Sequence, residues 1–426
     1  MIGQPRISVT PNPAMLDEPA DIRISGAPAN AWITVRAAVR DNWGTDWESF
    51  GEFWVDSRGE CRVAVQIPRE GTYRCADPMG LIWSMVRKGT DPAHRTPFAP
   101  LQTKLNVLVN GEKVAETVWT RWMIAPHVVR TPVRENGLVG TFFVPDSGGP
   151  YPAIVVLGGS EGGLRENNAA LLAAHGFAAL ALAYFKAGAL PQQLMHIPLE
   201  YIHSGIRWLQ AQPNVAAAKL GIVGTSRGGE LALLCASLFP EIRAVVGLVP
   251  SHVVNGGLGQ APSGERPFAW TWKGAGIPYM DSPAPLEVRQ ELKRQREAGE
   301  PLQYRPYFLS QLVDEARVDE VKIPVHDIQG PVLLVSGGDD RMWPSSIYCE
   351  RIIEQLARHN HPYERMHLLY PEAGHLIYAP YGPMTDRGNE YVMGGTPEVD
   401  AKAQADAWPE IVAFLTRSLG EPTLAR

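Results

Sequence analysis

Hydrophobic and polar residues alternate with a period of two over the first 130 or so residues, and short turn-forming stretches interrupt the alternation. The alternating segments are ADIRISG, AWITVRAAVRD, SFGEFWVDS, CRVAVQI and KLNVLVNGEKVAETVWT, and the interruptions are APAN, NWGTD and SRGE. A period of two is typical of strands with one buried face. Several short strands without convincing helices predict a β-sandwich, which we assign to residues 1–135.

One segment breaks this alternation. Residues 77–85, DPMGLIWSM, are mostly apolar and include tryptophan and methionine. We expect them to fill the sandwich, or its interface with the next domain, rather than to contact a ligand.

After about residue 150, continuous apolar runs alternate with segments of helical period. The strand-like runs are AIVVLGG, FAALALAY, KLGIVG, AVVGLV and PVLLVSG, and the helix-like segments are NNAALLAAHG and LEYIHSGIRWLQAQ. Fully apolar strands separated by helices predict a parallel sheet with helices on both faces. We therefore predict an α/β domain over residues 136–426.

The alternation lapses between Pro250 and Gly330, where proline, glycine and charged residues dominate. We expect a cap-like insertion at about residues 251–329. Its segment LEVRQELKRQREAGE predicts a helix with four basic residues, Arg289, Lys293, Arg294 and Arg296. We interpret them as a solvated helix face rather than as a site for an anion.

Composition restricts the classes of function. The chain has 426 residues, of which 45% are hydrophobic and 20% charged, as in soluble globular proteins. A formal net charge of −6 argues against nucleic acid as a partner. No run of eighteen apolar residues occurs, and the start MIGQPRISVT lacks the apolar core of a signal peptide. We therefore expect no membrane partner and a cytoplasmic location, and the oligomeric state stays open.

The four cysteines, Cys61, Cys75, Cys235 and Cys349, lack the spacing of metal ligands or of a redox pair. Cys61 and Cys75 are close enough in sequence to pair if the protein were exported, but a reduced state is the simpler interpretation. We expect no metal and no redox cofactor.

The segment GIVGTSRGGELALL encloses one serine, Ser226, among glycines. An apolar strand precedes it and an apolar helix follows, which is the arrangement of the G-x-S-x-G nucleophile elbow. Small residues are required there because side chains two positions before or after the serine would collide in the strained turn. Ser226 is therefore the candidate nucleophile.

A serine hydroxyl needs a base, and the base needs a carboxylate to orient it. In this type of sheet the chain order is serine, acid, histidine. The strand PVLLVSG leads into a loop with Asp339 and Asp340, and the strand HLLY leads into a loop with His375. We predict Asp340 as the acid and His375 as the base, with Asp339 orienting its loop. Other histidines have weaker claims, although His252 lies after a strand and is a candidate for the pocket wall.

The oxyanion formed on attack requires hydrogen-bond donors. We predict the backbone N–H of Arg227 as one donor. The second should come from the glycine-rich LGGSEGG, where Gly159, Ser160 and Glu161 remain alternatives, with Gly159 and Ser160 preferred. A phosphate-binding loop is the rival interpretation, but the lysine and serine or threonine of a P-loop are missing.

These motifs resemble, nearly end to end, the acyl-CoA thioesterase and bile acid-CoA:amino acid N-acyltransferase family. The resemblance rests on DPMGLIWSM, LGGSEGG, GTSRGGE, GGDDRMW, GHLIYAPY and GGTPEVDAKAQADAW. It implies an immunoglobulin-like β-sandwich followed by an α/β-hydrolase domain, with Ser226, Asp340 and His375 in the catalytic roles. Arg227 stands where many relatives have lysine, and Tyr378-Ala379-Pro380 follows where relatives often have Glu-Pro-Pro.

The nucleophile separates two activities within the family. Amino-acid-conjugating relatives typically have cysteine there and hydrolytic relatives serine, and an oxygen ester is less susceptible to attack by amines than a thioester. The resemblance therefore implies an acyl-CoA thioesterase, with coenzyme A as part of a small-molecule substrate. Three alternatives stay open: transfer of the acyl group to an amino acid, hydrolysis of oxygen esters or lactones, and a binding protein with an inert hydrolase domain.

Overall fold

The structure is a computed structural model that describes residues 4–259, 267–388 and 390–421. Two compact units make up the chain. The first comprises Met1–Ala125 together with Ala379–Arg387 and Pro397–Ala405. The second comprises Pro126–Tyr378, Gly388–Thr396 and Asp406–Arg426. The division at residue 135 that the sequence suggests stays a prediction.

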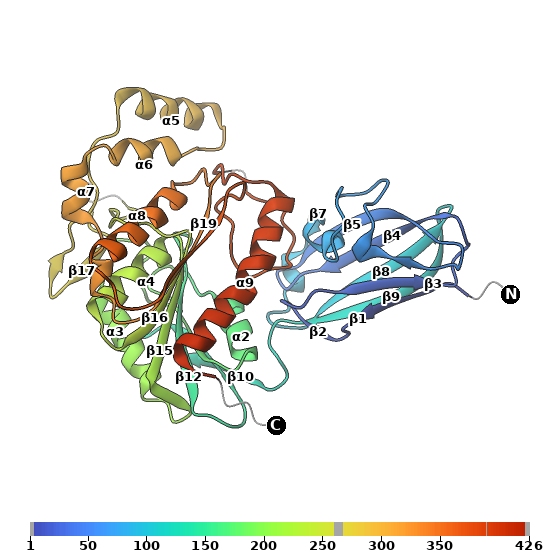
Figure 1. Ribbon diagram of the computed structural model, residues 1–426, viewed down its shortest axis with the longest axis horizontal. Helices are drawn as coiled ribbons and strands as arrows, with labels where there is room; N and C mark the ends of the chain where they lie inside the picture. The colour runs from blue at the N-terminus through green and yellow to red at the C-terminus, as the bar shows by residue number, and fades with distance from the viewer. Residues whose placement is uncertain (1–3, 260–266, 389, 422–426) are drawn as a thin grey trace. The chain divides into compact units, whose positions relative to one another are not determined.

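Two sheets form the first unit, as predicted for a β-sandwich (Figure 1). The smaller sheet has the order β1 (Arg6–Thr10), β3 (Asp21–Ser25) and β6 (Cys61–Arg62). The larger has the order β2 (Ala14–Met15), β9 (Glu112–Trp122), β8 (Leu101–Val109), β4 (Trp32–Arg40), β5 (Thr45–Trp54) and β7 (Val86–Thr90). Burial alternates along β3, β4 and β5, so one face of each strand supplies the core.

Two predicted strands of this unit differ from the structure. The run KLNVLVNGEKVAETVWT is a hairpin rather than one strand, because Asn110 and Gly111 both take positive φ and join β8 to β9. The strand predicted over CRVAVQI pairs only at Cys61–Arg62 and then becomes a 3₁₀ turn at Val63–Val65. The side chain of Gln66 then replaces backbone pairing by bonding both the N–H and the carbonyl of Trp54.

The apolar segment 77–85 lies inside the first unit. Its helix α1 (Gly80–Trp83) is buried and packs against β4 and β5. The Leu81 carbonyl accepts a hydrogen bond from Ser49 Oγ at 2.5 Å, and Trp83 Nε1 donates to Asp77 Oδ2 at 3.1 Å. This confirms that the segment fills the sandwich.

One sheet runs through the second unit. Its order is β10 (Val128–Val133), β11 (Gly140–Pro145), β13 (Ala178–Leu182), β12 (Tyr151–Leu157), β15 (Val215–Thr225), β16 (Ile242–Leu248), β19 (Val332–Gly337) and β20 (Arg365–Tyr370). The six strands from β13 to β20 are parallel, and β10 and β11 are antiparallel to their neighbours. Every residue of β11, β12, β13 and β19 is buried, as expected for strands covered on both faces.

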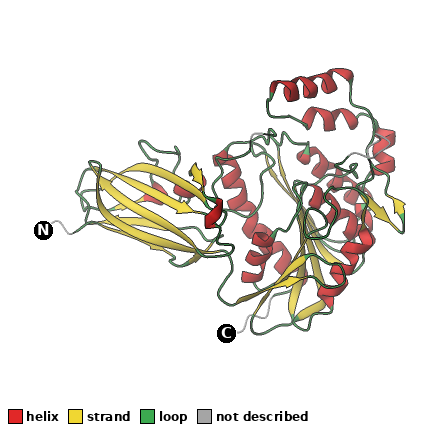
Figure 2. Cartoon of the chain, turned by 180° about the vertical axis from the view of Figure 1, so that it is seen from behind, coloured by secondary structure: helices red, strands yellow, loops and turns green. Residues whose placement is uncertain are grey.

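Helices cover both faces of this sheet (Figures 1 and 2). They are α2 (Glu166–Ala174), α3 (Leu199–Gln210), α4 (Arg227–Leu238), α8 (Ser345–Arg358) and α9 (Pro397–Leu419), of which α9 belongs to the second unit from Asp406 onward. Side chains of α3, α4 and α8 share one hydrophobic core with the strands. This is the predicted α/β-hydrolase fold.

The insertion after β16 contains two short strands and three helices. The strands β17 (Trp270–Trp272) and β18 (Ala275–Gly276) form a small sheet with β14 (Ile197–Pro198), which precedes α3, in the order β14, β17, β18. The helices α5 (Leu286–Ala298), α6 (Arg305–Gln311) and α7 (Glu315–Val321) follow. α5 ends at Gly299, which takes the left-handed conformation. Residues 260–266 of the predicted cap lie outside the described residues. In the described parts of the chain, no helix is long and apolar enough to cross a membrane.

Candidate active site

Ser226 lies in a strained turn between β15 and α4. Its φ of 55° and ψ of −119° are unfavourable for a residue with a side chain. Two backbone hydrogen bonds hold the turn: Ser226 N–H donates to Leu248 O at 2.8 Å, and Glu230 N–H donates to Ser226 O at 3.0 Å. The neighbouring strand β16 and the first turn of α4 therefore fix the backbone that presents the hydroxyl.

The glycines around Ser226 are required by close backbone contacts. A Cβ on Gly224 would lie 2.0 Å from Gly228 O, and a Cβ on Gly228 would lie 2.1 Å from Gly158 O. Both distances are far inside van der Waals contact, and the clashing atoms are backbone atoms. The predicted collision two residues to either side of the serine is confirmed.

Asp340 and His375 lie beside Ser226 in the order that the sequence predicts. His375 Nε2 is 3.0 Å from Ser226 Oγ, and His375 Nδ1 is 2.8 Å from Asp340 Oδ2. Because a carboxylate only accepts hydrogen bonds, Nδ1 is the protonated nitrogen, which leaves Nε2 to accept from the serine hydroxyl. Each residue follows its own parallel strand, β15, β19 or β20, so all three meet at one sheet edge.

Asp340 is fully buried and well supplied with donors. Oδ1 accepts from the N–H groups of Met342 and Trp343 at 3.0 and 3.2 Å, and Oδ2 also accepts from Ser345 Oγ at 2.6 Å. These bonds fix the carboxylate that faces His375. The Trp343 ring stands edge-on to the His375 ring, with centroids 5.8 Å apart.

Asp339 holds the loop, as predicted. Its carboxylate accepts from Arg341 Nε at 2.9 Å and from Gly395 N–H at 2.9 Å. These donors hold the pKa of Asp339 below its usual range, although partial burial opposes the shift. The bond to His375 Nδ1 comes from Asp340, whereas Asp339 bonds residues of the loop.

The glycine-rich loop after β12 reaches Ser226 through Gly159. A Cβ on Gly159 would lie 3.3 Å from Ser226 Cβ and 3.2 Å from Thr225 O. The carbonyl of Gly158 accepts from Tyr184 Oη at 2.6 Å, which anchors the loop. The predicted donor of Gly159 thus lies next to the nucleophile, whereas Ser160 is exposed.

Sequence reasoning missed a buried network behind the elbow. Glu230 is fully buried and its carboxylate accepts from Arg227 Nη1 at 2.7 Å and from Trp270 Nε1 at 2.8 Å. Asn255 adds its backbone N–H at 3.2 Å and its Nδ2 at 2.9 Å. Burial raises the pKa of Glu230, and the Arg227 guanidinium opposes this shift.

Arg227 completes this network with its side chain. Nη2 donates to the carbonyls of Asn255 and Gly256 at 3.0 and 3.3 Å, and the guanidinium lies over the Trp270 ring. Arg227, whose backbone N–H is the predicted oxyanion donor, is therefore also fixed through its side chain. A glutamate three positions after Arg227, followed by the apolar run LALLCA, was the signal that could have revealed this network.

Several of the other histidines have structural partners. His203 bonds Glu241, His361 bonds the Gly330 carbonyl and His367 bonds Ser336. His252 is buried against Tyr348, and neither ring nitrogen has a hydrogen-bond partner. Burial lowers the pKa of His252 to about 3, so the ring is neutral at physiological pH.

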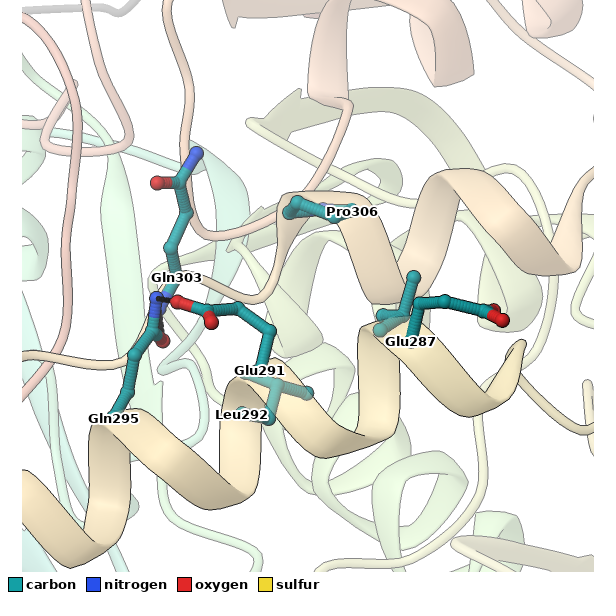
Figure 3. Close-up of a pocket in the computed structure, with 7 residues that line it drawn as sticks. Glu287, Glu291, Leu292, Gln295, Gln303 and Pro306 are labelled. Atoms are coloured by element: carbon teal, nitrogen blue, oxygen red, sulfur yellow. Dashed lines mark hydrogen bonds between the residues drawn. The ribbon is translucent and has the colours of Figure 1, made fainter.

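A separate pocket lies along α5 and is shown in Figure 3. Its volume is about 340 Å³, and its lining residues are Glu287, Val288, Glu291, Leu292, Gln295, Gln303 and Pro306. Two carboxylates in the lining oppose the binding of an anion. Arg294 is paired with Glu291 and Glu300 at 2.7 and 2.9 Å, which agrees with a solvated basic face.

The described residues contain no group of three or more histidine, cysteine, aspartate or glutamate side chains arranged to hold a metal ion.

Comparison with known proteins identifies relatives over nearly the whole chain. Residues 197–421 match the family model for the C-terminal part of BAAT and acyl-CoA thioester hydrolases, and residues 17–135 match the model for the N-terminal region of the same family. Acyl-coenzyme A thioesterase 1 of Mus musculus is 32% identical over 96% of this chain and 95% of its own. The peroxisomal succinyl-coenzyme A thioesterase of Mus musculus is 32% identical over 95% of this chain and 94% of its own.

Among solved structures, a putative dienelactone hydrolase from Klebsiella pneumoniae covers 68% of this chain and 98% of its own, with 17% identity and a TM-score of 0.42.

Proposed function

The chain belongs to the acyl-CoA thioester hydrolase/BAAT family of enzymes, and from this membership we propose that it hydrolyses an acyl-CoA to the free acid and coenzyme A. The contact of His375 Nε2 with Ser226 Oγ at 3.0 Å is the observation that carries the proposal. A hydroxyl within hydrogen-bond reach of an oriented imidazole is an activated nucleophile.

In the first half-reaction Ser226 Oγ attacks the thioester carbonyl while His375 Nε2 takes the hydroxyl proton. Asp340 keeps the proton on Nδ1 and stabilises the imidazolium that forms. The tetrahedral oxyanion rests on the N–H groups of Arg227 and Gly159. When the C–S bond breaks, the imidazolium returns its proton to the departing coenzyme A sulfur.

The second half-reaction hydrolyses the acyl-serine. His375 takes a proton from water, the hydroxide oxygen attacks the ester carbonyl, and Ser226 leaves with the proton. Water is the favoured acceptor because the acyl-enzyme is an oxygen ester, which amines attack less readily than a thioester.

Product analysis by mass spectrometry tests this proposal. Purified enzyme would be given a panel of acyl-CoAs that includes succinyl-CoA, with and without glycine and taurine, and Ser226→Ala would serve as control. Free acid and coenzyme A, unaffected by the amines and absent with Ser226→Ala, are expected. An N-acyl amino acid as the main product would contradict hydrolysis, and turnover of oxygen esters alone would contradict the thioester as substrate.

A further inference from the structure

Glu161 occupies the donor that the reaction requires. Its Oε1 accepts the Gly159 N–H at 3.0 Å, the N–H that the proposed function assigns to the oxyanion. A Cβ on Gly159 would lie 2.8 Å from Glu161 Oε2 and 3.3 Å from Ser226 Cβ. The carboxylate and the nucleophile thus border the same point of the loop.

Arg165 is the counter-ion of this carboxylate while it lies at Gly159. Its Nη2 forms an ion pair with Glu161 Oε1. The side chain lies along the loop, since a Cβ on Gly158 would be 3.4 Å from Arg165 Cγ and 3.8 Å from its Nε. Arg165 Nε is buried without a hydrogen-bond partner, so the guanidinium has an unused donor.

These contacts conflict with catalysis. A carboxylate and an oxyanion both carry negative charge, and they would compete for the Gly159 N–H and repel one another. The thioester oxygen can take the donor only after Glu161 leaves it. The Glu161 side chain is 47% exposed, so it has room to turn toward solvent. Arg165 can move with it as its counter-ion.

We propose that Glu161 is a specificity-determining residue: an internal anion that closes the Gly159 donor until a substrate with enough binding energy displaces the carboxylate toward solvent. The proposal rests on the proposed function, in which Gly159 serves the oxyanion. The free energy needed to displace the carboxylate comes from contacts that the substrate makes away from the reacting carbonyl. The nucleotide of coenzyme A supplies such contacts, whereas a small activated ester does not. Glu161 therefore discriminates against small esters.

The test compares Glu161→Ala and Glu161→Gln with wild type on p-nitrophenyl acetate and on an acyl-CoA. We expect kcat/KM for p-nitrophenyl acetate to rise by about tenfold or more in Glu161→Ala, and by less in Glu161→Gln, whose amide can still accept the Gly159 N–H. The acyl-CoA kcat/KM should change much less.

Glu372→Ala is the matched control, because Glu372 is an exposed carboxylate three positions before His375. Its removal should leave the ratio of the two activities unchanged. An unchanged ratio in Glu161→Ala, or an equal loss of both activities, would overturn the proposal and assign Glu161 to loop positioning. A gain of activity is a result that a merely structural role does not produce.

A second readout separates this proposal from the proposed function. The rate at which a fluorophosphonate labels Ser226 depends on the oxyanion donors but on no particular substrate. Faster labelling of Glu161→Ala would support the internal anion even if no acyl-CoA were hydrolysed. Unchanged or slower labelling would refute it even if thioesterase activity were established.

Discussion

The carboxylate of Asp340 is held by a set of hydrogen bonds. It is fully buried and accepts hydrogen bonds from Met342, Trp343 and Ser345 in addition to His375. An exposed aspartate would be free to turn away from the imidazole. Here the donors fix the oxygen that selects the tautomer of His375, so the role of Asp340 is to orient the imidazole and to stabilise its charge.

Asp340→Asn should therefore lower kcat by about 10³–10⁴-fold while the protein stays folded, because an amide that donates to His375 favours the wrong tautomer. Steady-state kinetics on an acyl-CoA measures this loss. Asp339→Asn is the adjacent control and should cost less than about tenfold, since Asp339 bonds Arg341 and Gly395 instead. A larger loss in Asp339→Asn than in Asp340→Asn would reverse the assignment.

The tight junction between β15 and α4 can form only with glycine at position 228. A Cβ on Gly228 would lie 2.1 Å from Gly158 O, and neither backbone segment can retreat without moving the loop that carries Gly159. We expect Gly228→Ala to abolish fluorophosphonate labelling of Ser226 and to destabilise the fold by about 3 kcal/mol or more. Gly89→Ala in β7, where a Cβ meets nothing within 4 Å, is the control and should change the free energy of unfolding by less than about 0.5 kcal/mol. Normal labelling of Gly228→Ala would show that the elbow tolerates a wider turn.

The network around Glu230 joins α4 to β17 and to the loop after β16. Glu230→Gln leaves the buried Arg227 guanidinium without its counter-ion, so we expect it to cost about 3–5 kcal/mol in the free energy of unfolding. Glu297→Gln is the matched substitution, because the Lys293–Glu297 pair is exposed and 3.7 Å long. It should cost less than about 1 kcal/mol. Chemical denaturation measures both, and equal costs would contradict the role given to the buried pair.

Sequence reasoning succeeds for features that a local pattern encodes. Ser226, Asp340 and His375 each follow an apolar strand, and the carboxyl ends of parallel strands share one edge, so their meeting could be inferred from the order of elements. Contacts between distant residues leave no such pattern. The bonds of Glu230 to Asn255 and Trp270 depend on how the insertion folds back.

The same limit applies to whole segments. Residues 397–405 pack in the first unit although they follow the second unit's strands in the chain, and no periodicity indicates this return. The strand expected over CRVAVQI shortens because only Cys61 and Arg62 find partners in β3. Alternation shows that a segment can pair, but the pairing stops where the backbone turns into the 3₁₀ helix at Val63–Val65.

The state of the four cysteines favours a serine nucleophile over a cysteine nucleophile. Cys61, Cys235 and Cys349 are buried, and Cys75 is half-buried. Burial raises the pKa of every one of these thiols, to about 12 for Cys61 and Cys75. The reactive thiolate is therefore scarce throughout the folded protein.

We accordingly expect N-ethylmaleimide at pH 7 to leave the activity of the native enzyme unchanged, and a fluorophosphonate to abolish it. Titration with a chromogenic disulfide should find four reactive thiols only after unfolding in guanidinium. Ser226→Cys, made as the positive control, should become sensitive to N-ethylmaleimide. Rapid inactivation of the wild type by the maleimide would place a thiol in the mechanism and contradict the account.

The proposed mechanism requires that an acyl group pass through Ser226. The most direct measurement is rapid quenching of the enzyme during turnover of an acyl-CoA, followed by peptide mass spectrometry. We predict that the peptide with Ser226 carries the mass of the acyl group, and that a folded Ser226→Ala protein shows neither this adduct nor turnover. An acyl group on another residue, or continued turnover by Ser226→Ala, would contradict the account.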